Sequence, residues 1–285
     1  NNKDLKKYKK YKTVAIFGMG GSILGANAIY SFLQKKINKR FLFFDNLDQT
    51  KINNFNNKEN IREILFIFIS KSGDTIETIT NINLIRKNKI NLKNTIIITE
   101  NKNNTLKRLS EKLKIYFVEH KKYIGGRYSV LSEVGMLPAS LMGLSINSIR
   151  KNLIKYFKKE NKNLLIDSVA KIANIYLDKK INTIIFFNYC PELKNFLFWC
   201  QQLIAESLGK KGKGLLPVIS TAPKDHHSLL QLYLDGPKDK IFYVFSSKND
   251  NNSKTPSNIT RNTFKIINAQ KESFIKVLEK KNIPY

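Results

Sequence analysis

The sequence contains very little cysteine and histidine, with two residues of the first type and three of the second among 285. A structural zinc site needs four such ligands close together, so this scarcity argues against one, and we expect no metal. Low cysteine usage is typical of a reducing compartment and predicts a cytoplasmic location. Cys200 lies in an apolar stretch with helical spacing, and we interpret it as a core residue rather than a nucleophile.

Long apolar runs are also missing. No run reaches the roughly 18 residues that a membrane span requires, so we expect no membrane segment. The first twelve residues, NNKDLKKYKKYK, are basic and lack the apolar region of a secretory signal. The sequence does not begin with Met and ends in KKNIPY directly after a helix-like stretch, from which we expect a piece of a longer protein.

Acidic residues are few, 22 against 50 lysines and arginines, which leaves a net charge of +28. Strongly basic chains often bind nucleic acid. Here the lysines are spread along the whole chain together with many Asn and Ile, which is typical of a compositional bias rather than of a binding patch. We therefore expect no nucleic-acid partner, although a positive field would attract a small anionic substrate.

Hydrophobic residues make up 42% of the chain, enough for a packed core. Apolar runs of strand length alternate with stretches of helical spacing, which predicts βαβ units and a parallel sheet. The runs are almost wholly apolar, as expected for strands that are covered on both faces. In the first half the predicted strands are 14–17, 41–44, 64–69, 95–99 and 115–118.

The same alternation restarts in the second half, after a mostly helical region over 130–180. There the predicted strands are 183–187, 216–220 and 241–245, and the predicted helices are 191–208 and 227–234. We therefore expect an α/β protein in two parts, residues 1–145 and residues 146–285, the second beginning with a helical connector. Residues 248–263 are polar and are predicted to form a surface loop.

A cluster of hydroxyl side chains follows the third predicted strand, in ISKSGDTIET over residues 69–78. Ligands of parallel sheets bind beyond the carboxyl ends of the strands, and the helix that starts here presents free N–H groups and a partial positive charge. Gly73 permits close approach of the backbone. An ordinary helix cap is the alternative, but it needs only one hydroxyl. Four hydroxyls predict a phosphate site: Ser70, Ser72, Thr75 and Thr78.

A glycine-rich turn follows the first predicted strand, in VAIFGMGGSILG over residues 14–25. The pattern is close to the G-x-G-x-x-G of dinucleotide sites, with Asp45 as the acid for the ribose, but Ile23 stands where the last glycine is required. Gly21 and Ser22 offer a backbone N–H and a hydroxyl instead. Together with the hydroxyl cluster, this turn favours a sugar monophosphate over a dinucleotide, and we expect no cofactor.

Five stretches carry a resemblance to a known family. GMGGSILG (18–25) and SKSGDTIET (70–78) resemble the sugar-isomerase (SIS) domain. Three more resemble the glucose-6-phosphate isomerase family and follow in its order: GGRYSVLSEVGMLP (125–138), QQLIAESLGKKGKG (201–214) and DHHSLLQLYLDGP (225–237). The resemblance implies two SIS-type α-β-α sandwich halves with parallel, flavodoxin-like sheets.

The resemblance also implies aldose–ketose isomerisation, in which a base moves a proton between C1 and C2 of an opened sugar phosphate. The family's base falls on Glu206. Apolar neighbours on its helix are expected to raise the pKa of this carboxyl by desolvation. The alternative for Glu206 is a solvated carboxylate at a helix end, paired with Lys210.

Further roles are carried over in the same way. Arg127, after two glycines, falls on the family residue that stabilises the enediolate oxygen. The HSLLQL register assigns ring opening to His227 rather than to His226. Gln202 falls on a position that faces the substrate. The phosphate-binding positions fall on Gly21, Ser22, Ser70, Lys71, Ser72, Thr75 and Thr78.

Two family properties bear on partners and on activity. The family's site is commonly completed by a second subunit that supplies the His, so we expect a homodimer. The family also places a catalytic Lys near its C-terminus, and nothing after residue 250 matches that segment, so we expect weak or no activity from this chain alone. Two alternatives stay open: a non-catalytic phosphosugar-binding module, and a related isomerase that also accepts mannose 6-phosphate or an amino sugar.

Overall fold

The chain folds into two compact units, residues 1–154 and residues 155–285. A computed structural model describes residues 5–85, 90–91, 93–177, 181–247 and 258–285. The unit boundary lies nine residues after the predicted one, because helix α7 (Ile146–Arg150) packs on α6 (Glu133–Leu141) of the first unit. In the described part of the chain, no helix is both long enough and apolar enough to cross a membrane.

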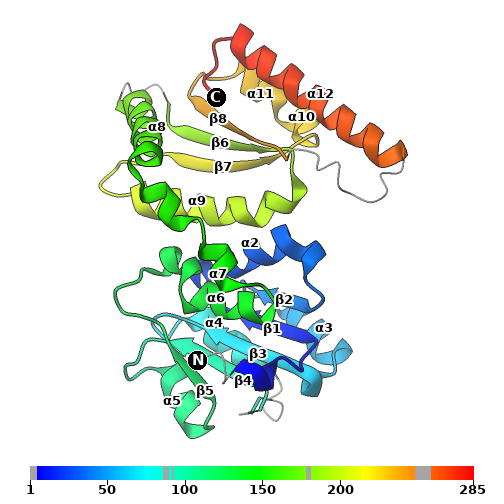
Figure 1. Cartoon of the computed structure of the whole chain (residues 1–285), viewed down its shortest axis with the longest axis vertical. Coiled ribbons are helices and arrows are strands. Elements are labelled where there is room, and N and C mark those ends of the chain that lie inside the picture. Colours follow the sequence, from blue (N-terminus) through cyan, green and yellow to red (C-terminus); the bar gives the residue numbers. More distant parts are fainter. Residues whose placement is uncertain (1–4, 86–89, 92, 178–180, 248–257) are drawn as a thin grey trace. The chain divides into compact units, whose positions relative to one another are not determined.

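The first unit is built on a parallel sheet in the order β2-β1-β3-β4-β5 (Figure 1). This is the flavodoxin-like winding that the resemblance implies, and the α/β prediction is confirmed. Each strand begins and ends within one residue of its predicted range. The strands are β1 (Thr13–Phe17), β2 (Arg40–Phe44), β3 (Ile64–Ile69), β4 (Thr95–Thr99) and β5 (Tyr116–Glu119).

Both faces of this sheet are covered by helices, which explains why its central strands are almost wholly apolar. All six residues of β3 are buried, and they alternate between two cores. Helices α2 (Leu24–Leu33) and α6 contribute to the core on one face. Three helices contribute to the core on the other face: α3 (Gln49–Lys58), α4 (Ile76–Leu84) and α5 (Thr105–Lys112).

The second unit has a parallel sheet of β6 (Thr183–Asn188), β7 (Leu216–Thr221) and β8 (Lys240–Phe245), in the order β7-β6-β8. The order matches that of the first three strands of the first unit. Its helices are α8 (Lys159–Leu177), α9 (Lys194–Leu208), α10 (Asp225–Ser228), α11 (Leu230–Asp235) and α12 (Asn258–Lys280). Helices α8 and α9 contribute to the core on one face of the sheet, and α11 and α12 to the core on the other.

Short 3-10 turns connect these elements. They are η1 (Lys6–Tyr8), η2 (Gly20–Ser22), η3 (Gln34–Lys36), η4 (Ile61–Glu63), η6 (Gly126–Leu131), η7 (Leu153–Phe157) and η8 (Pro191–Leu193). The predicted helix over 191–208 therefore starts as a 3-10 turn, and the one over 227–234 is divided between α10 and α11 at Leu229.

The predicted surface loop over 248–263 is too long. Residues 248–257 lie outside the described residues, but helix α12 already begins at Asn258. The apolar residues that anchor this helix, Ile267, Phe274 and Leu278, come later in the chain. The helix extends N-terminally beyond them into polar sequence, which has no apolar periodicity of its own to reveal it.

We expect Phe17→Ala to destabilise the first unit by about 3–5 kcal/mol, because the deleted ring leaves a cavity. The Phe17 ring is fully buried and stacks on Phe44 with 4.3 Å between ring centroids. Urea unfolding of the purified protein measures the change. Phe32→Ala is the control, since Phe32 is 55% exposed. Equal losses in the two variants would contradict the assignment of Phe17 to the core.

Candidate functional site

The carboxyl ends of β1 and β3 form the point where the winding of the first sheet reverses. The two strands are neighbours in the sheet, but the helices that follow them, α2 and α4, pack on opposite faces. Open parallel sheets bind ligands in the crevice that such a reversal leaves. The glycine-rich turn leaves from one strand and the hydroxyl cluster from the other, so the fold brings both predicted binding segments to this crevice.

The glycine-rich turn is a 3-10 turn rather than a dinucleotide loop. Gly20 adopts φ of 52°, a conformation that glycine takes without strain. Ile23, at the position where the dinucleotide pattern requires glycine, is completely buried in the core. Ser22 is 8% exposed and lies at the end of the turn. This geometry agrees with the expectation that the turn does not bind a dinucleotide.

Three of the four predicted hydroxyls gather at the N-terminus of α4. Ser70 Oγ lies 2.7 Å from Thr75 Oγ1, and Ser72 Oγ lies 3.4 Å from each of them. The Ser70 hydroxyl accepts a hydrogen bond from Gly73 N at 3.1 Å. Thr75 is the N-cap residue of α4, yet its side chain makes no capping hydrogen bond. The hydroxyls therefore face one another instead of closing the helix end, which favours anion binding over ordinary capping. Ser70 itself is only 1% exposed, so Ser72 and Thr75 are the hydroxyls of this cluster that a ligand can reach.

Thr78 does not join this cluster. Its side chain is completely buried, and its hydroxyl has no hydrogen-bond partner among the described residues. Thr78 lies within the first turns of α4, whose buried residues pack toward the sheet. In this structure its hydroxyl is therefore not accessible to a ligand.

Gly73 and Asn104 hold the hydroxyl cluster in place. Gly73 has φ of 79°, and a Cβ there would lie 1.9 Å from Asn104 Oδ1. Asn104 also caps α5 by accepting a hydrogen bond from Lys107 N at 2.9 Å. Our sequence analysis missed Asn104, although an Asn directly before a helical stretch is a recognised cap signal.

The turn that carries Arg127 packs directly on the glycine-rich turn. A Cβ on Gly21 would lie 2.2 Å from the Gly126 carbonyl oxygen and 2.5 Å from Arg127 N. Ser129, which sequence reasoning also missed, donates hydrogen bonds to the carbonyl oxygens of Gly21 and Gly126 at 3.2 and 2.7 Å. The guanidinium of Arg127 lies over the Tyr128 ring, 4.5 Å from its centroid. The first unit thus brings Gly21, Ser22 and the Arg127 backbone together.

In the second unit, Gln202 and Glu206 lie one turn apart on α9. The Gln202 side-chain amide donates a hydrogen bond to Glu206 Oε2 at 3.1 Å. The apolar surroundings expected for Glu206 are not present, because its side chain is exposed. The core face of α9 carries Leu197, Cys200 and Ile204, and a residue two positions after Ile204 lies on the opposite face. The exposure of Glu206 therefore agrees better with the alternative interpretation, a solvated carboxylate near a helix end, than with a carboxyl in apolar surroundings.

The two adjacent histidines have different environments. The His226 ring packs against Phe187 and Phe274, and its Nε2 lies 2.8 Å from the Tyr189 hydroxyl. Burial lowers the pKa of His226 from its ordinary value, with a smaller contribution from the neighbouring His227. The His227 side chain is exposed. His226 is thus a packing residue, and His227 is the histidine that a ligand can reach.

Asp225 anchors the short helix that carries both histidines. Its carboxylate is 6% exposed and accepts hydrogen bonds from Thr221 N at 2.7 Å, Ser220 Oγ at 2.9 Å and Ser228 Oγ at 3.0 Å. Burial opposes the charged form, but these hydrogen bonds outweigh it and hold the pKa of Asp225 below its ordinary value. The carboxylate therefore ties α10 to the end of β7.

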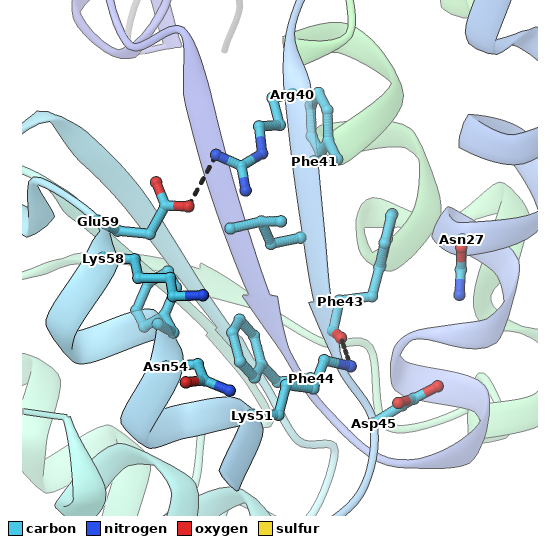
Figure 2. Close-up of a pocket in the computed structure, with 12 residues that line it drawn as sticks. Asn27, Arg40, Phe41, Phe43, Phe44, Asp45, Lys51, Asn54, Lys58 and Glu59 are labelled. Carbon is cyan, nitrogen blue, oxygen red and sulfur yellow. Dashed lines mark hydrogen bonds and ion pairs between the residues drawn. The ribbon is translucent and has the colours of Figure 1, made fainter. Parts of the chain in front are cut away.

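A pocket of about 450 Å³ lies along β2, the edge strand of the first sheet (Figure 2). Asp45, the acid of the rejected dinucleotide interpretation, lines it. Lys51 Nζ donates to the Phe43 carbonyl oxygen at 2.8 Å, and Arg40 forms an ion pair with Glu59 at 2.7 Å. Charged side chains commonly protect the edge strand of a sheet in this way. Among the described residues, no group of three or more His, Cys, Asp or Glu side chains is arranged to hold a metal ion.

Known proteins share both the sequence pattern and the fold. The sequence model of the phosphoglucose isomerase family matches residues 4–220. The chain is 37% identical to the glucose-6-phosphate isomerase of Methanocaldococcus jannaschii over 257 residues, which cover 87% of this chain and 64% of that protein. It is 34% identical to the glucose-6-phosphate isomerase of Campylobacter jejuni over 247 residues, which cover 81% of this chain and 60% of that protein. The chain thus spans less than two thirds of the length of these relatives.

Solved structures agree on the fold. A hypothetical protein from Thermus thermophilus matches with a TM-score of 0.81 and 22% identity, over 99% of this chain and 74% of that chain. A glucose-6-phosphate isomerase from Chlamydia trachomatis matches with a TM-score of 0.69 and 20% identity, over 93% of this chain and 56% of that chain. At these identities the likeness supports the fold alone.

We expect Gly21→Ala to destabilise the first unit by about 2 kcal/mol or more, because the added Cβ overlaps backbone atoms that cannot move aside cheaply. The matched control is Gly126→Ala in the facing turn, where an added Cβ meets nothing within 4 Å. Urea unfolding, followed by far-UV circular dichroism, compares the two variants. If Gly126→Ala were as costly as Gly21→Ala, close packing of the two turns would not be the cause.

We expect Asp225→Asn to reduce the stability of the second unit by about 1–3 kcal/mol at pH 7, since it weakens hydrogen bonds to a buried charge. The folded-state pKa of Asp225 lies below its ordinary value, so the stability it contributes is present at neutral pH and is lost as pH falls through that folded-state pKa. The difference from wild type should therefore shrink in acid.

Urea unfolding between pH 7 and acid measures this difference, with the exposed Asp167→Asn as the control. A difference that did not change with pH would show that the Asp225 charge plays no part.

Proposed function

Because this chain belongs to the phosphoglucose isomerase family, whose sequence model matches residues 4–220, we propose that the protein interconverts glucose 6-phosphate and fructose 6-phosphate. The observation that carries the proposal is the cluster of Ser70, Ser72 and Thr75 at an uncapped helix N-terminus beside the glycine-rich turn. Such a helix end offers free N–H groups to a dianionic phosphate, and the hydroxyls add further donors. Gly21 and Ser22 bound the same crevice.

The reacting end of the sugar needs a base and an oxyanion stabiliser. We assign Glu206 as the base, which removes the proton from C2 of the open aldose and returns it to C1, while the hydroxyl proton of O2 passes to O1, so that the intermediate is the cis-enediol in its enediolate form. Arg127 is assigned to the oxygen that becomes negative in this intermediate, where one donor contributes roughly 3–4 kcal/mol. Since Glu206 is exposed in this chain, the desolvation that favours proton transfer has to come from the bound sugar.

His227 is assigned to ring opening, and the fold supports its supply by a second subunit. Helix α9 starts after β6 and runs back along the sheet (Figure 1), so Glu206 lies about 18 Å from the start of that helix. Helix α10 with His227 follows the carboxyl end of β7 directly. The two side chains therefore belong to opposite ends of the second sheet, and one sugar cannot contact both within a single second unit. A homodimer that shares its sites resolves this.

The compartment and the partners follow from the same proposal. Cys190 and Cys200 are both free thiols, as expected in the reducing cytoplasm, where we place the protein. The ligand is a sugar phosphate, and no cofactor takes part in the proposed reaction.

We expect Glu206→Gln to lower turnover by about 10²–10⁴-fold, because the amide cannot accept the proton. Binding of fructose 6-phosphate should stay nearly unchanged, since the phosphate contacts lie in the first unit. The measurements are exchange of the C2 hydrogen of glucose 6-phosphate with solvent, by NMR, and fructose 6-phosphate affinity by calorimetry. Glu272→Gln, which neutralises an exposed carboxylate on α12 of the same unit, is the control.

The exchange assay also separates the alternatives. A full-length version of this protein that binds fructose 6-phosphate but exchanges no C2 hydrogen would be a non-catalytic phosphosugar-binding module. Equal rates with mannose 6-phosphate would instead indicate a broader aldose–ketose isomerase. Equal loss of binding and exchange in Glu206→Gln would show that Glu206 has a structural role.

A further inference from the structure

Lys71 lies between two hydroxyls of the phosphate loop, yet its ammonium bonds to a different segment. Its Nζ donates hydrogen bonds to the carbonyl oxygens of Lys122 and Ile124, at 3.0 and 2.8 Å. Glu100 Oε1 lies 3.7 Å away. A lysine ammonium has three N–H donors, and the two carbonyl groups take two of them, while the Glu100 carboxylate forms an ion pair beyond hydrogen-bond distance.

The acceptors of Lys71 belong to the turn that leads into Arg127. Lys122 and Ile124 directly precede Gly125, the N-cap residue of η6. The turn is closed by a hydrogen bond from Ile124 N to the Lys121 carbonyl oxygen at 3.1 Å. Any shift of this turn changes where η6 begins, and with it the position of Arg127.

The main chain of Lys71 is fixed as firmly as its side chain. Its carbonyl oxygen accepts hydrogen bonds from Glu100 N at 3.2 Å and from Thr99 Oγ1 at 3.3 Å. His120 N in turn donates to the Thr99 carbonyl oxygen at 2.8 Å. The residues that follow β3, β4 and β5 are therefore joined side by side, and Lys71 is the residue that extends this connection to the turn.

Glu100 supplies a negative charge near the Lys71 ammonium. The Glu100 carboxylate is 13% exposed and accepts a hydrogen bond from Lys102 at 2.9 Å. That hydrogen bond and the charges of Lys102 and Lys71 hold the pKa of Glu100 below its ordinary value, although burial acts in the opposite direction. Glu100 thus forms a close pair with Lys102 and a longer ion pair with Lys71.

We propose that Lys71 is a positioning residue, whose ammonium holds the 121–124 turn and thereby aligns Arg127 with the phosphate loop. This inference rests on the proposed function, and it departs from the phosphate-binding role that the family resemblance implies for Lys71. Ser72 and Thr75, the accessible hydroxyls of the loop, hold the anion, and Lys71 links that loop rigidly to the residue that stabilises the enediolate. Misplacement of a catalytic group by about 1 Å can cost on the order of 10²-fold in rate, so such a link matters to turnover.

Lys71→Met tests this role, because it keeps the length of the side chain and removes its charge and donors. We expect faster amide hydrogen exchange over residues 121–128 and a kcat about 10–100-fold lower. The KM for fructose 6-phosphate and the affinity for inorganic phosphate should stay within about twofold of wild type, since a positioning residue does not contact the phosphate. Lys71→Arg should restore much of kcat, because a guanidinium can also donate to two carbonyl groups.

Lys102→Met is the matched control. It removes an equal charge beside the same carboxylate without touching the turn, so exchange, kcat and phosphate affinity should all stay close to wild type. If Lys71→Met failed to fold by circular dichroism, Lys71→Gln, which keeps a donor group, would take its place.

Other results would overturn the inference. A loss of phosphate affinity with unchanged exchange over 121–128 would make Lys71 a phosphate ligand. Equal effects of Lys71→Met and Lys102→Met would reduce its role to general electrostatic attraction. If a full-length version of the protein did not isomerise hexose phosphates, the proposed function would fail, while the exchange and phosphate measurements would still decide whether Lys71 holds the turn.

Discussion

The parallel pairing of β1 with β3 is the constraint on which the first unit depends. The strands pair in register from Thr13 and Ile64 to Phe17 and Phe68, so they end at the same level. The turns that follow them must therefore leave the sheet side by side, and they approach so closely that a Cβ on Gly18 would lie 2.9 Å from the Ile69 carbonyl oxygen. A ligand at this point meets two backbone segments at once, which is what a compact anion such as phosphate requires.

Close backbone contacts then convert these loops into a rigid cradle. A Cβ on Gly21 would overlap the Gly126 carbonyl group, and a Cβ on Gly73 would overlap the Asn104 side chain, which would have to move. Each contact joins a loop to a segment distant in sequence, so the cradle is specified by tertiary packing and not by the loops alone. The ammonium of Lys71 completes the arrangement, because it links the hydroxyl cluster to the turn before Gly125. A fixed array of donors stabilises charge without the reorganisation that solvent would need.

The sequence predicted the strands well because buried parallel strands are continuous apolar runs with polar ends. It also predicted that the glycine-rich turn and the hydroxyl cluster follow strand ends, and a loop that follows such a strand must lie at the carboxyl edge of the sheet. The exposure of Glu206 was not predictable in the same way, because an apolar helix has two faces and only the fold decides which one the sheet covers. The pairing of His226 with Tyr189 joins residues 37 positions apart, and no local pattern signals it. The burial of Thr78 likewise follows from the packing of α4.

The proposed chemistry is divided between the two units, and the division has a physical reason. The first unit offers backbone N–H groups and hydroxyls at a helix N-terminus, which suit a group that stays charged and does not react. The second unit supplies Glu206 and His227, exposed groups that can exchange protons. Its helix α10 is anchored by Asp225 at one point and by the Tyr189–His226 contact at another. The exposed His227 therefore lies on a helix that is held in place. In the proposed reaction the anion site and the proton-transfer groups share no side chain, so a change in the protonation of Glu206 or His227 would leave the phosphate contacts unchanged.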